Sequence, residues 1–190
     1  MHSLVLGPEE PESDDVDEWL TLDVEVARRL AGAGDRVVLR WPAVTLHQAP
    51  RLQGLSLEAI VAGRSGAELD ESLRALGVAL ASGAAVRAAL AYGDTGIDCY
   101  RAAAATRRSL GTAVPIRARW DGPLDVKGAA LALTFGADEI AGPMAPPKQR
   151  FKLAQVGGPP EDGGRPSPTF VESLIQAAGR FPARRRQGDR

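Results

Sequence analysis

Short apolar segments with strand character alternate with helical segments along most of this chain. Residues 36–41 and 86–92 are apolar runs of strand length, and residues 114–120 alternate between apolar side chains and arginines. Between these runs, leucines recur at helical spacing over residues 67–83, and an alanine-rich helix is expected over residues 97–110. Strands that alternate with helices of this length favour parallel pairing, so the pattern predicts an α/β fold.

Further elements are expected on both sides of this central region. Leu22, Val26 and Leu30 lie four residues apart, which predicts a helix over residues 19–30. Ser56 has the character of a helix N-cap, so we expect a helix after it. The remaining expectations are a strand at 3–7, a helix at 124–135, a short segment at 139–141 and a final helix at 169–178.

The chain of 190 residues has the length of one domain with tails. We expect four parts: an acidic N-terminal lead (1–18), an α/β domain (19–144), a loop rich in proline and glycine (145–168), and a C-terminal helix with a basic tail (169–190). A complete eight-fold barrel typically takes about 250 residues, so this chain has room for four or five βα units. The expected architecture is a partial (β/α) barrel of parallel units.

The charge balance limits the classes of partner. Lys and Arg number 23 and Asp and Glu 24, so a net charge of -1 offers no global field for nucleic acid. No apolar run reaches the length of a membrane span and the acidic start is unlike a signal peptide, so we expect a cytoplasmic protein. The seven acids within residues 9–18 indicate a solvated loop or, alternatively, a docking surface for a basic partner.

The cysteine and histidine content limits the kinds of metal site. Cys99 is the only cysteine, so the chain alone builds neither an intrachain disulfide nor a cysteine-ligated zinc or iron–sulfur site. His2 and His47 are the only histidines, and we interpret His47 as a surface residue. We therefore predict no metal site in this chain.

Two segments resemble a known family. Residues 98–144 contain CYRAAAATRRSLGTAVPIRARW and VKGAALALTFGADEIAGPM, and residues 169–186 contain FVESLIQAAGRFPARR. The family's "IPNIQASW" strand, "AQLALxFGANDLGGT" helix and "LxxLIREAGRxPVxR" end are similar. They belong to the radical SAM enzymes of the futalosine route to menaquinone, of the aminofutalosine synthase and dehypoxanthine futalosine cyclase type, and of the related deazaflavin-coenzyme pathway. A looser similarity begins near residue 70. The resemblance implies the C-terminal half of a TIM-like barrel.

The chain departs from this family in its cluster motif. Members carry Cys-x3-Cys-x2-Cys, which holds the [4Fe–4S] cluster that cleaves S-adenosylmethionine, and this sequence lacks the motif. We therefore expect no cofactor on this chain alone. S-adenosylmethionine and the cluster enter only if a partner chain supplies the other half of the barrel.

Candidate substrate-binding residues follow from the resemblance and from strand ends. The resemblance implies that Tyr92, Trp120 and Asp138 lie at the mouth of the barrel, and Arg119 offers a fork to a carboxylate or phosphate. The indole of Trp120 would stack on a purine, so a nucleoside-like small molecule is the expected ligand. The alternatives are structural: Trp120 packs, Asp138 caps a turn, and Arg117 and Arg119 lie on a solvated face.

Three functional hypotheses remain open. The first is a truncated or divergent homologue that is not catalytic alone, either a pseudoenzyme or one part of a two-chain enzyme with a protein partner or a second copy of itself. The second is a non-catalytic regulatory or interaction protein built on the inherited α/β fold. The third is an unrelated α/β enzyme with Asp138 or Asp94 as its general base. Catalytic residues cannot be assigned from the sequence.

Overall fold

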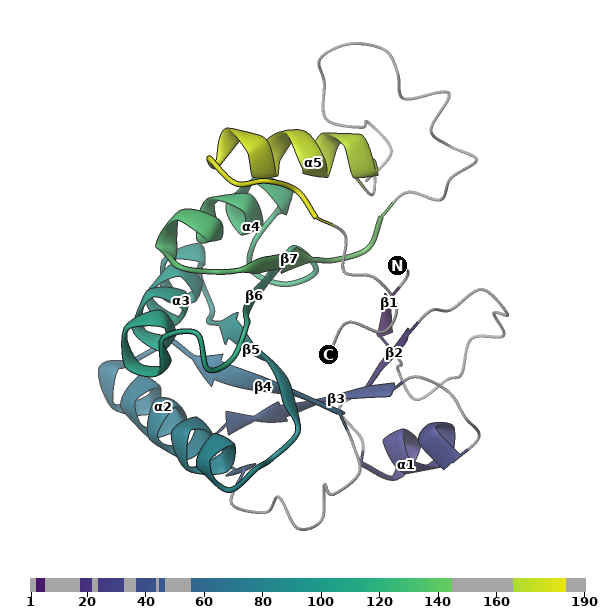
Figure 1. Cartoon of the computed structure of the whole chain (residues 1–190), viewed down its shortest axis with the longest axis vertical. Coiled ribbons are helices and arrows are strands. Elements are labelled where there is room, and N and C mark those ends of the chain that lie inside the picture. The colour runs from purple at the N-terminus through teal and green to yellow at the C-terminus, as the bar shows by residue number, and fades with distance from the viewer. Residues whose placement is uncertain are drawn as a thin grey trace.

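The computed structural model describes residues 3–5, 18–21, 24–32, 37–43, 45–46, 56–144 and 166–183. It contains one sheet of seven parallel strands, whose order in the sheet is their order along the chain (Figure 1). The strands are β1 (Ser3–Val5), β2 (Glu18–Thr21), β3 (Val37–Pro42), β4 (Ser56–Ala62), β5 (Val86–Tyr92), β6 (Ile116–Arg119) and β7 (Glu139–Ala141).

In the described part of the chain, five α-helices follow five of the strands. They are α1 (Val24–Gly32), α2 (Gly66–Ala81), α3 (Gly96–Leu110), α4 (Val126–Ala132) and α5 (Pro168–Ala177), and the 3-10 helix η2 (Leu133–Phe135) continues α4. Helices α2, α3 and α4 lie side by side along one face of the sheet, and α5 packs against α4 (Figure 1). We call this the helix-covered face and the opposite one the inner face. The predicted α/β class with parallel strands is therefore confirmed.

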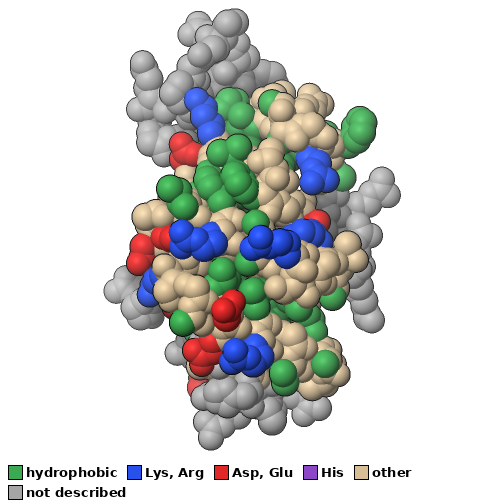
Figure 2. Space-filling model, turned by 90° about the vertical axis from the view of Figure 1, so that its left-hand side faces the viewer, with side chains coloured by type: hydrophobic (Ala, Val, Ile, Leu, Met, Phe, Trp, Pro, Cys, Tyr) green, Lys and Arg blue, Asp and Glu red, His purple; other side chains and the backbone are tan. Residues whose placement is uncertain are grey.

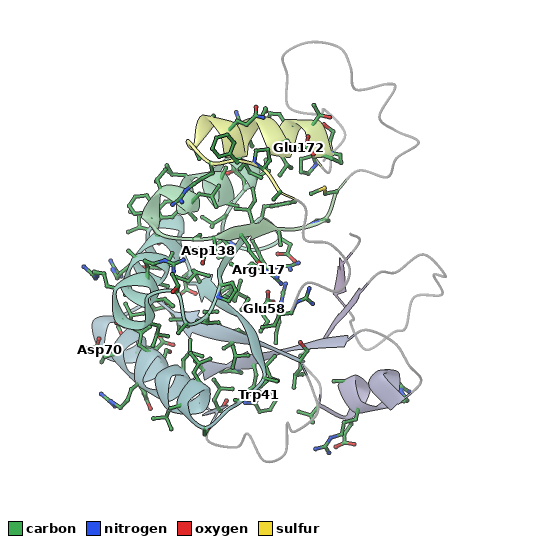
Figure 3. The ribbon with its side chains drawn as sticks, viewed as in Figure 1. Trp41, Glu58, Asp70, Arg117, Asp138 and Glu172 are labelled. Atoms are coloured by element: carbon green, nitrogen blue, oxygen red, sulfur yellow. The ribbon has the colours of Figure 1, made fainter. Side chains whose placement is uncertain are left out.

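Alternation along β4 separates the two faces of the sheet. Leu57, Ala59 and Val61 are buried in the core under the helices. Glu58 stands between them and points to the inner face, away from α2 and α3 (Figure 3). The core side of α3 consists of small residues such as Ala102 and Ala103, which are fully buried and let the helix lie close to the strands.

The loops after β4 and β5 share the pattern Gly-x-Ser/Thr-Gly. Ser65 caps α2 by accepting the amide of Glu68, and Thr95 caps α3 in a reciprocal capping box. A Cβ at Gly93 would lie 2.2 Å from the Cβ of Asp98, so the first turn of α3 needs glycine there. These two loops fix where the helices begin.

Two predicted helices differ from the structure. Residues 18–21 form the strand β2, and α1 begins only at Val24 instead of at residue 19. The segment after Ser56 is not a helix but the strand β4. Strand β4 is buried on both faces of the sheet, since Leu57 and Ala59 on one face and Glu58 on the other are at most 1% exposed, and such strands read as nearly continuous apolar runs. The other predicted elements in the described residues are confirmed within a few residues.

Several predictions lie outside the described residues. These are most of the acidic lead, both histidines, residues 145–165 of the loop and the tail from residue 184. The division into four parts therefore stays a prediction. Among the described residues, no pairing joins β7 to β1, so the structure shows a parallel βα sheet without showing a closed barrel.

Candidate functional site

The inner face of the sheet carries a buried network of ion pairs, centred on Glu58. The side chain of Glu58 is fully buried and accepts hydrogen bonds from Arg40 Nε at 2.8 Å and Arg117 Nη1 at 2.9 Å (Figure 3). Arg40 is the register neighbour of Glu58 on β3, whereas Arg117 reaches it from β6. One carboxylate thus neutralises part of the charge of two arginines from different strands.

Arg117 has a second acidic partner on the next strand. Its Nε and Nη2 atoms donate to Glu139 Oε2 at 3.0 and 2.6 Å, and Glu139 is its register neighbour on β7. Burial alone would lower the pKa of Arg117, but the charges of Glu58 and Glu139 and their hydrogen bonds raise it above its ordinary value. Arg117 is therefore a permanently charged group on the inner face.

A second pair lies at the carboxyl end of β6. Arg119 Nε and Nη2 donate to the two carboxylate oxygens of Asp121, each at 2.8 Å, in a bidentate pair. Arg40 Nη2 lies 3.5 Å from Asp121 Oδ2 and links this pair to Glu58. Although burial would raise the pKa of Asp121, the hydrogen bonds from Arg119 and the charges of Arg119 and Arg40 lower it overall.

The Arg40–Asp121 contact also shows that the inner face is concave. Strands β3 and β6 are separated by β4 and β5, so in a flat sheet they would lie about 14 Å apart. Contact at 3.5 Å between side chains from these positions requires the sheet to curl around them. The charged groups therefore line the inside of a curved sheet.

These positions correct one expectation from the sequence. Arg117 and Arg119 were expected on a solvated face if they had only a structural role, but they are 6% and 5% exposed. Sequence reasoning did not identify their partners Arg40, Glu58 and Asp121 as site residues. A usable signal was present, because β3 and β4 each contain one charged residue within an apolar run.

Two of the four candidate binding residues lie together on the inner face. Tyr92 is the last residue of β5 and half-buried, and a Cβ at Gly122 would lie 3.8 Å from its ring. Its ring therefore borders the turn that begins at Asp121, the partner of Arg119. The structure brings Tyr92 and Arg119 to the same face at the carboxyl ends of neighbouring strands.

Trp120 belongs to the other face. Its indole is 9% exposed, lies in the helix-side core and donates Nε1–H to the carbonyl of Pro143 at 3.1 Å. A Cβ at Gly142 would lie 2.4 Å from the indole ring, so that glycine makes room for it. Trp120 packs as a core residue in this structure, separate from Tyr92 and Arg119.

Asp138 lies at the opposite end of the strands. It precedes β7 and accepts the amide of Ile116, the first residue of β6, at 2.8 Å. It also pairs with Arg107 of α3, whose Nε donates to the carbonyl of Gly136 at 3.1 Å. Gly136 has a φ of 102°, where a side chain would collide with Arg107. Residues 135–138, the FGAD segment, thus form a structural joint that connects α3 to the amino ends of β6 and β7. In (β/α) barrels, residues at this end of the strands serve stability.

The remaining candidates are surface or core groups. Asp94 is exposed and forms an ion pair with Arg64 at 3.0 Å. Cys99 is buried, and burial raises the pKa of its thiol to about 11, so it is protonated at neutral pH. In the part of the chain that the structure describes, no group of three potential ligands for a metal ion lies together.

The described helices are all too short or too polar to span a lipid bilayer. Comparison of the sequence with protein-family models and with curated proteins found no match. The sheet, its inner face and the resemblance of the two segments are the observations that bear on function.

Proposed function

We propose that this chain is a truncated or divergent homologue of the futalosine-pathway radical SAM enzymes and is not catalytic alone. It works either as a pseudoenzyme or as one part of a two-chain enzyme in menaquinone biosynthesis. The observation that carries the proposal is a curled parallel sheet whose strand order follows the chain. Winding in one direction is the topology of (β/α) barrels, whereas doubly wound sheets reverse their strand order.

The segments that resemble the family form one compact block. Residues 98–144 contain α3, β6, α4 and β7, and the second segment contains α5, which packs against α4. The FGAD joint of this block has a structural role. The proposal is therefore strongest for the shared frame and depends on the inner face for ligand binding.

The only thiol of the chain restricts which chemistry it supplies. Cys99 is a buried core residue of α3, while a [4Fe–4S] cluster needs several thiolates. A cluster and bound S-adenosylmethionine would have to come from a partner chain. Within such an assembly this chain would contribute the inner-face arginines and Tyr92 to a nucleoside-like substrate.

Anaerobic reconstitution tests the proposal. The purified chain is treated with iron and sulfide and assayed for S-adenosylmethionine cleavage, alone and with the product of a neighbouring gene that carries three clustered cysteines. We expect bound iron and cleavage only with the partner, and the same result for Cys99→Ala. Cleavage by the isolated chain, or no binding of any such partner and of futalosine-type nucleosides, contradicts the proposal.

Binding is tested by a thermal shift with futalosine-type nucleosides. If Tyr92 contacts the ligand, Tyr92→Ala removes the shift while Tyr92→Phe keeps most of it. Asp94→Asn, which alters an exposed ion pair on the loop after β5, is the matched control and leaves the shift unchanged. An equal shift in Tyr92→Ala would exclude this end of the inner face as the binding site.

The second candidate is a non-catalytic interaction protein. Its support is the surface shown in Figure 2, where apolar side chains lie among Lys and Arg side chains. Val78, Ile97, Leu131 and Phe135 are between 42% and 68% exposed. Light scattering separates the candidates: we expect a defined assembly whose mass falls when Leu131 and Phe135 are changed to Ser, and an unchanged monomer would count against this candidate.

A further inference from the structure

We propose that Arg119 and Arg40 form a binding site for a small monocarboxylate, and that Asp121 occupies this site when no ligand is bound. The inference rests on the proposed function in treating the inner face as the ligand-binding face, and it names the chemical class of the ligand. Asp121 would then leave the arginines as the ligand carboxylate arrives.

Two arginines surround the carboxylate of Asp121. Arg119 holds both of its oxygens at 2.8 Å through Nε and Nη2, and Arg40 Nη2 approaches one of them at 3.5 Å. A planar fork that contacts both oxygens is the arrangement by which arginine recognises carboxylates in general. Any other carboxylate placed there would receive the same hydrogen bonds.

Asp121 lies nearer to the surface than Glu58 and Arg119. Its side chain is 17% exposed, whereas that of Glu58 is fully buried and that of Arg119 is 5% exposed. Asp121 also lies in the turn after β6, where its backbone is at the surface. Of the two acids that contact Arg40, Glu58 is held by two arginines in the interior, so Asp121 is the one whose exchange requires the smaller movement.

The charges of the inner-face network balance. Arg40, Arg117 and Arg119 face three acids, which are Glu58, Glu139 and Asp121. Replacing Asp121 by one monocarboxylate keeps the charge of the network unchanged, while a phosphate dianion adds a negative charge close to Glu58. The site therefore favours a carboxylate over a phosphate.

The proposed carboxylate site lies at the carboxyl ends of β5 and β6. Arg119 is the last residue of β6, and Tyr92 ends the neighbouring strand with its ring beside Gly122. Ligands of parallel α/β proteins bind at the carboxyl ends of the strands. A carboxylate held by Arg119 would place the rest of the ligand against the ring of Tyr92.

Chemical rescue tests the inference on the full chain. In Asp121→Ala the site between Arg119 and Arg40 has lost its carboxylate. Thermal unfolding of this variant is followed while sodium acetate replaces sodium chloride at constant ionic strength. We expect the melting temperature of Asp121→Ala to rise with acetate and to saturate, with a much smaller rise in the wild type. Inorganic phosphate is the comparison anion and is expected to be the weaker ligand.

Two further variants act as controls. Asp121→Asn fills the same space with a neutral amide and is expected to respond less to acetate than Asp121→Ala. Arg119→Lys in the Asp121→Ala background keeps the charge but loses the fork, so acetate should bind about tenfold more weakly. Equal responses in all variants, or phosphate as effective as acetate, overturn the proposal.

The test also covers a variant that does not fold in chloride. Asp121→Ala and the more polar Asp121→Ser are then refolded in acetate, where recovery supports the proposal and failure of both overturns it. The experiment needs no iron, S-adenosylmethionine or partner chain. Its failure is therefore distinguishable from failure of the proposed family function, which the reconstitution measures separately.

Discussion

Glu58 shows how one residue determines the character of the inner face. It is a fully buried carboxylate in a central strand, and its cost of burial is offset by two arginines at 2.8 and 2.9 Å. Removal of this acid would leave Arg117 with Glu139 alone and Arg40 with the longer contact to Asp121. The acid is therefore a structural requirement of any role that Arg40 and Arg117 have.

We predict that Glu58→Gln destabilises the protein by about 3–5 kcal/mol. The substitution removes the negative charge that faces the buried guanidinium groups of Arg40 and Arg117. Denaturant unfolding measures the change. Glu139→Gln is the matched control, since its side chain is 26% exposed and the loss should be smaller. Equal effects of the two substitutions would mean that burial does not set the cost.

Cys99 gives a pH prediction. Its thiol pKa is raised to about 11 in the folded protein from 9.0, so the folded state binds the proton more tightly than the unfolded state. The stabilisation is complete below pH 9.0 and is lost as the pH rises through about 11. The total is up to about 3 kcal/mol. Urea unfolding from pH 8 to 11 should show a larger loss in wild type than in Cys99→Ala, where the raised pKa of Tyr100 still contributes.

At the level of elements, close contact between loop and helix decides where α3 begins. Gly93 has no room for a side chain because Asp98 lies against it. We predict that Gly93→Ala destabilises the protein by about 1–3 kcal/mol through overpacking. Gly66→Ala is the control, because a Cβ there meets nothing within 4 Å, and it should be neutral or stabilising. Thermal unfolding of both variants gives the comparison.

The elements also show which parts of the fold the sequence predicts. The apolar run Val86–Tyr92 and the helical leucines of α2 are local signals, and both elements were predicted closely. Strand β4 was missed because both of its faces are buried and the sequence carries apolar residues on both, so no period distinguishes it from a short helix. Here tertiary pairing, which no local pattern contains, decides the conformation.

The candidate site was predicted less well for a related reason. Tyr92, Arg119 and Trp120 were chosen as candidates because they lie at or near strand ends, but the face on which such a side chain lies depends on alternation along the whole strand. Trp120 lies in the core under the helices, as the packing alternative had it, whereas Tyr92 and Arg119 lie on the inner face. The partners Arg40 and Glu58 come from separate strands, and only the parallel register places them beside each other.

At the level of the whole molecule, the sheet is expected to be most stable at its centre. Strands β4 and β5 have paired neighbours on both sides and are covered by α2 and α3, while the described pairings of β7 are with β6 alone. We predict that amide hydrogen exchange is slower in β4 and β5 than in β7. Mass spectrometry of peptic peptides measures it, and faster exchange in β4 than in β7 would contradict this picture.

The strand order has a consequence for how the protein is made. Each strand after β1 in the described sheet pairs with the strand that precedes it in the chain, as Ala89 of β5 does with Ala59 of β4. A polypeptide leaving the ribosome therefore adds every new strand to a sheet edge that has already been synthesised. Because no described strand must wait for a partner from the far end of the chain, unpaired edges are short-lived during synthesis, which limits aggregation of the nascent protein.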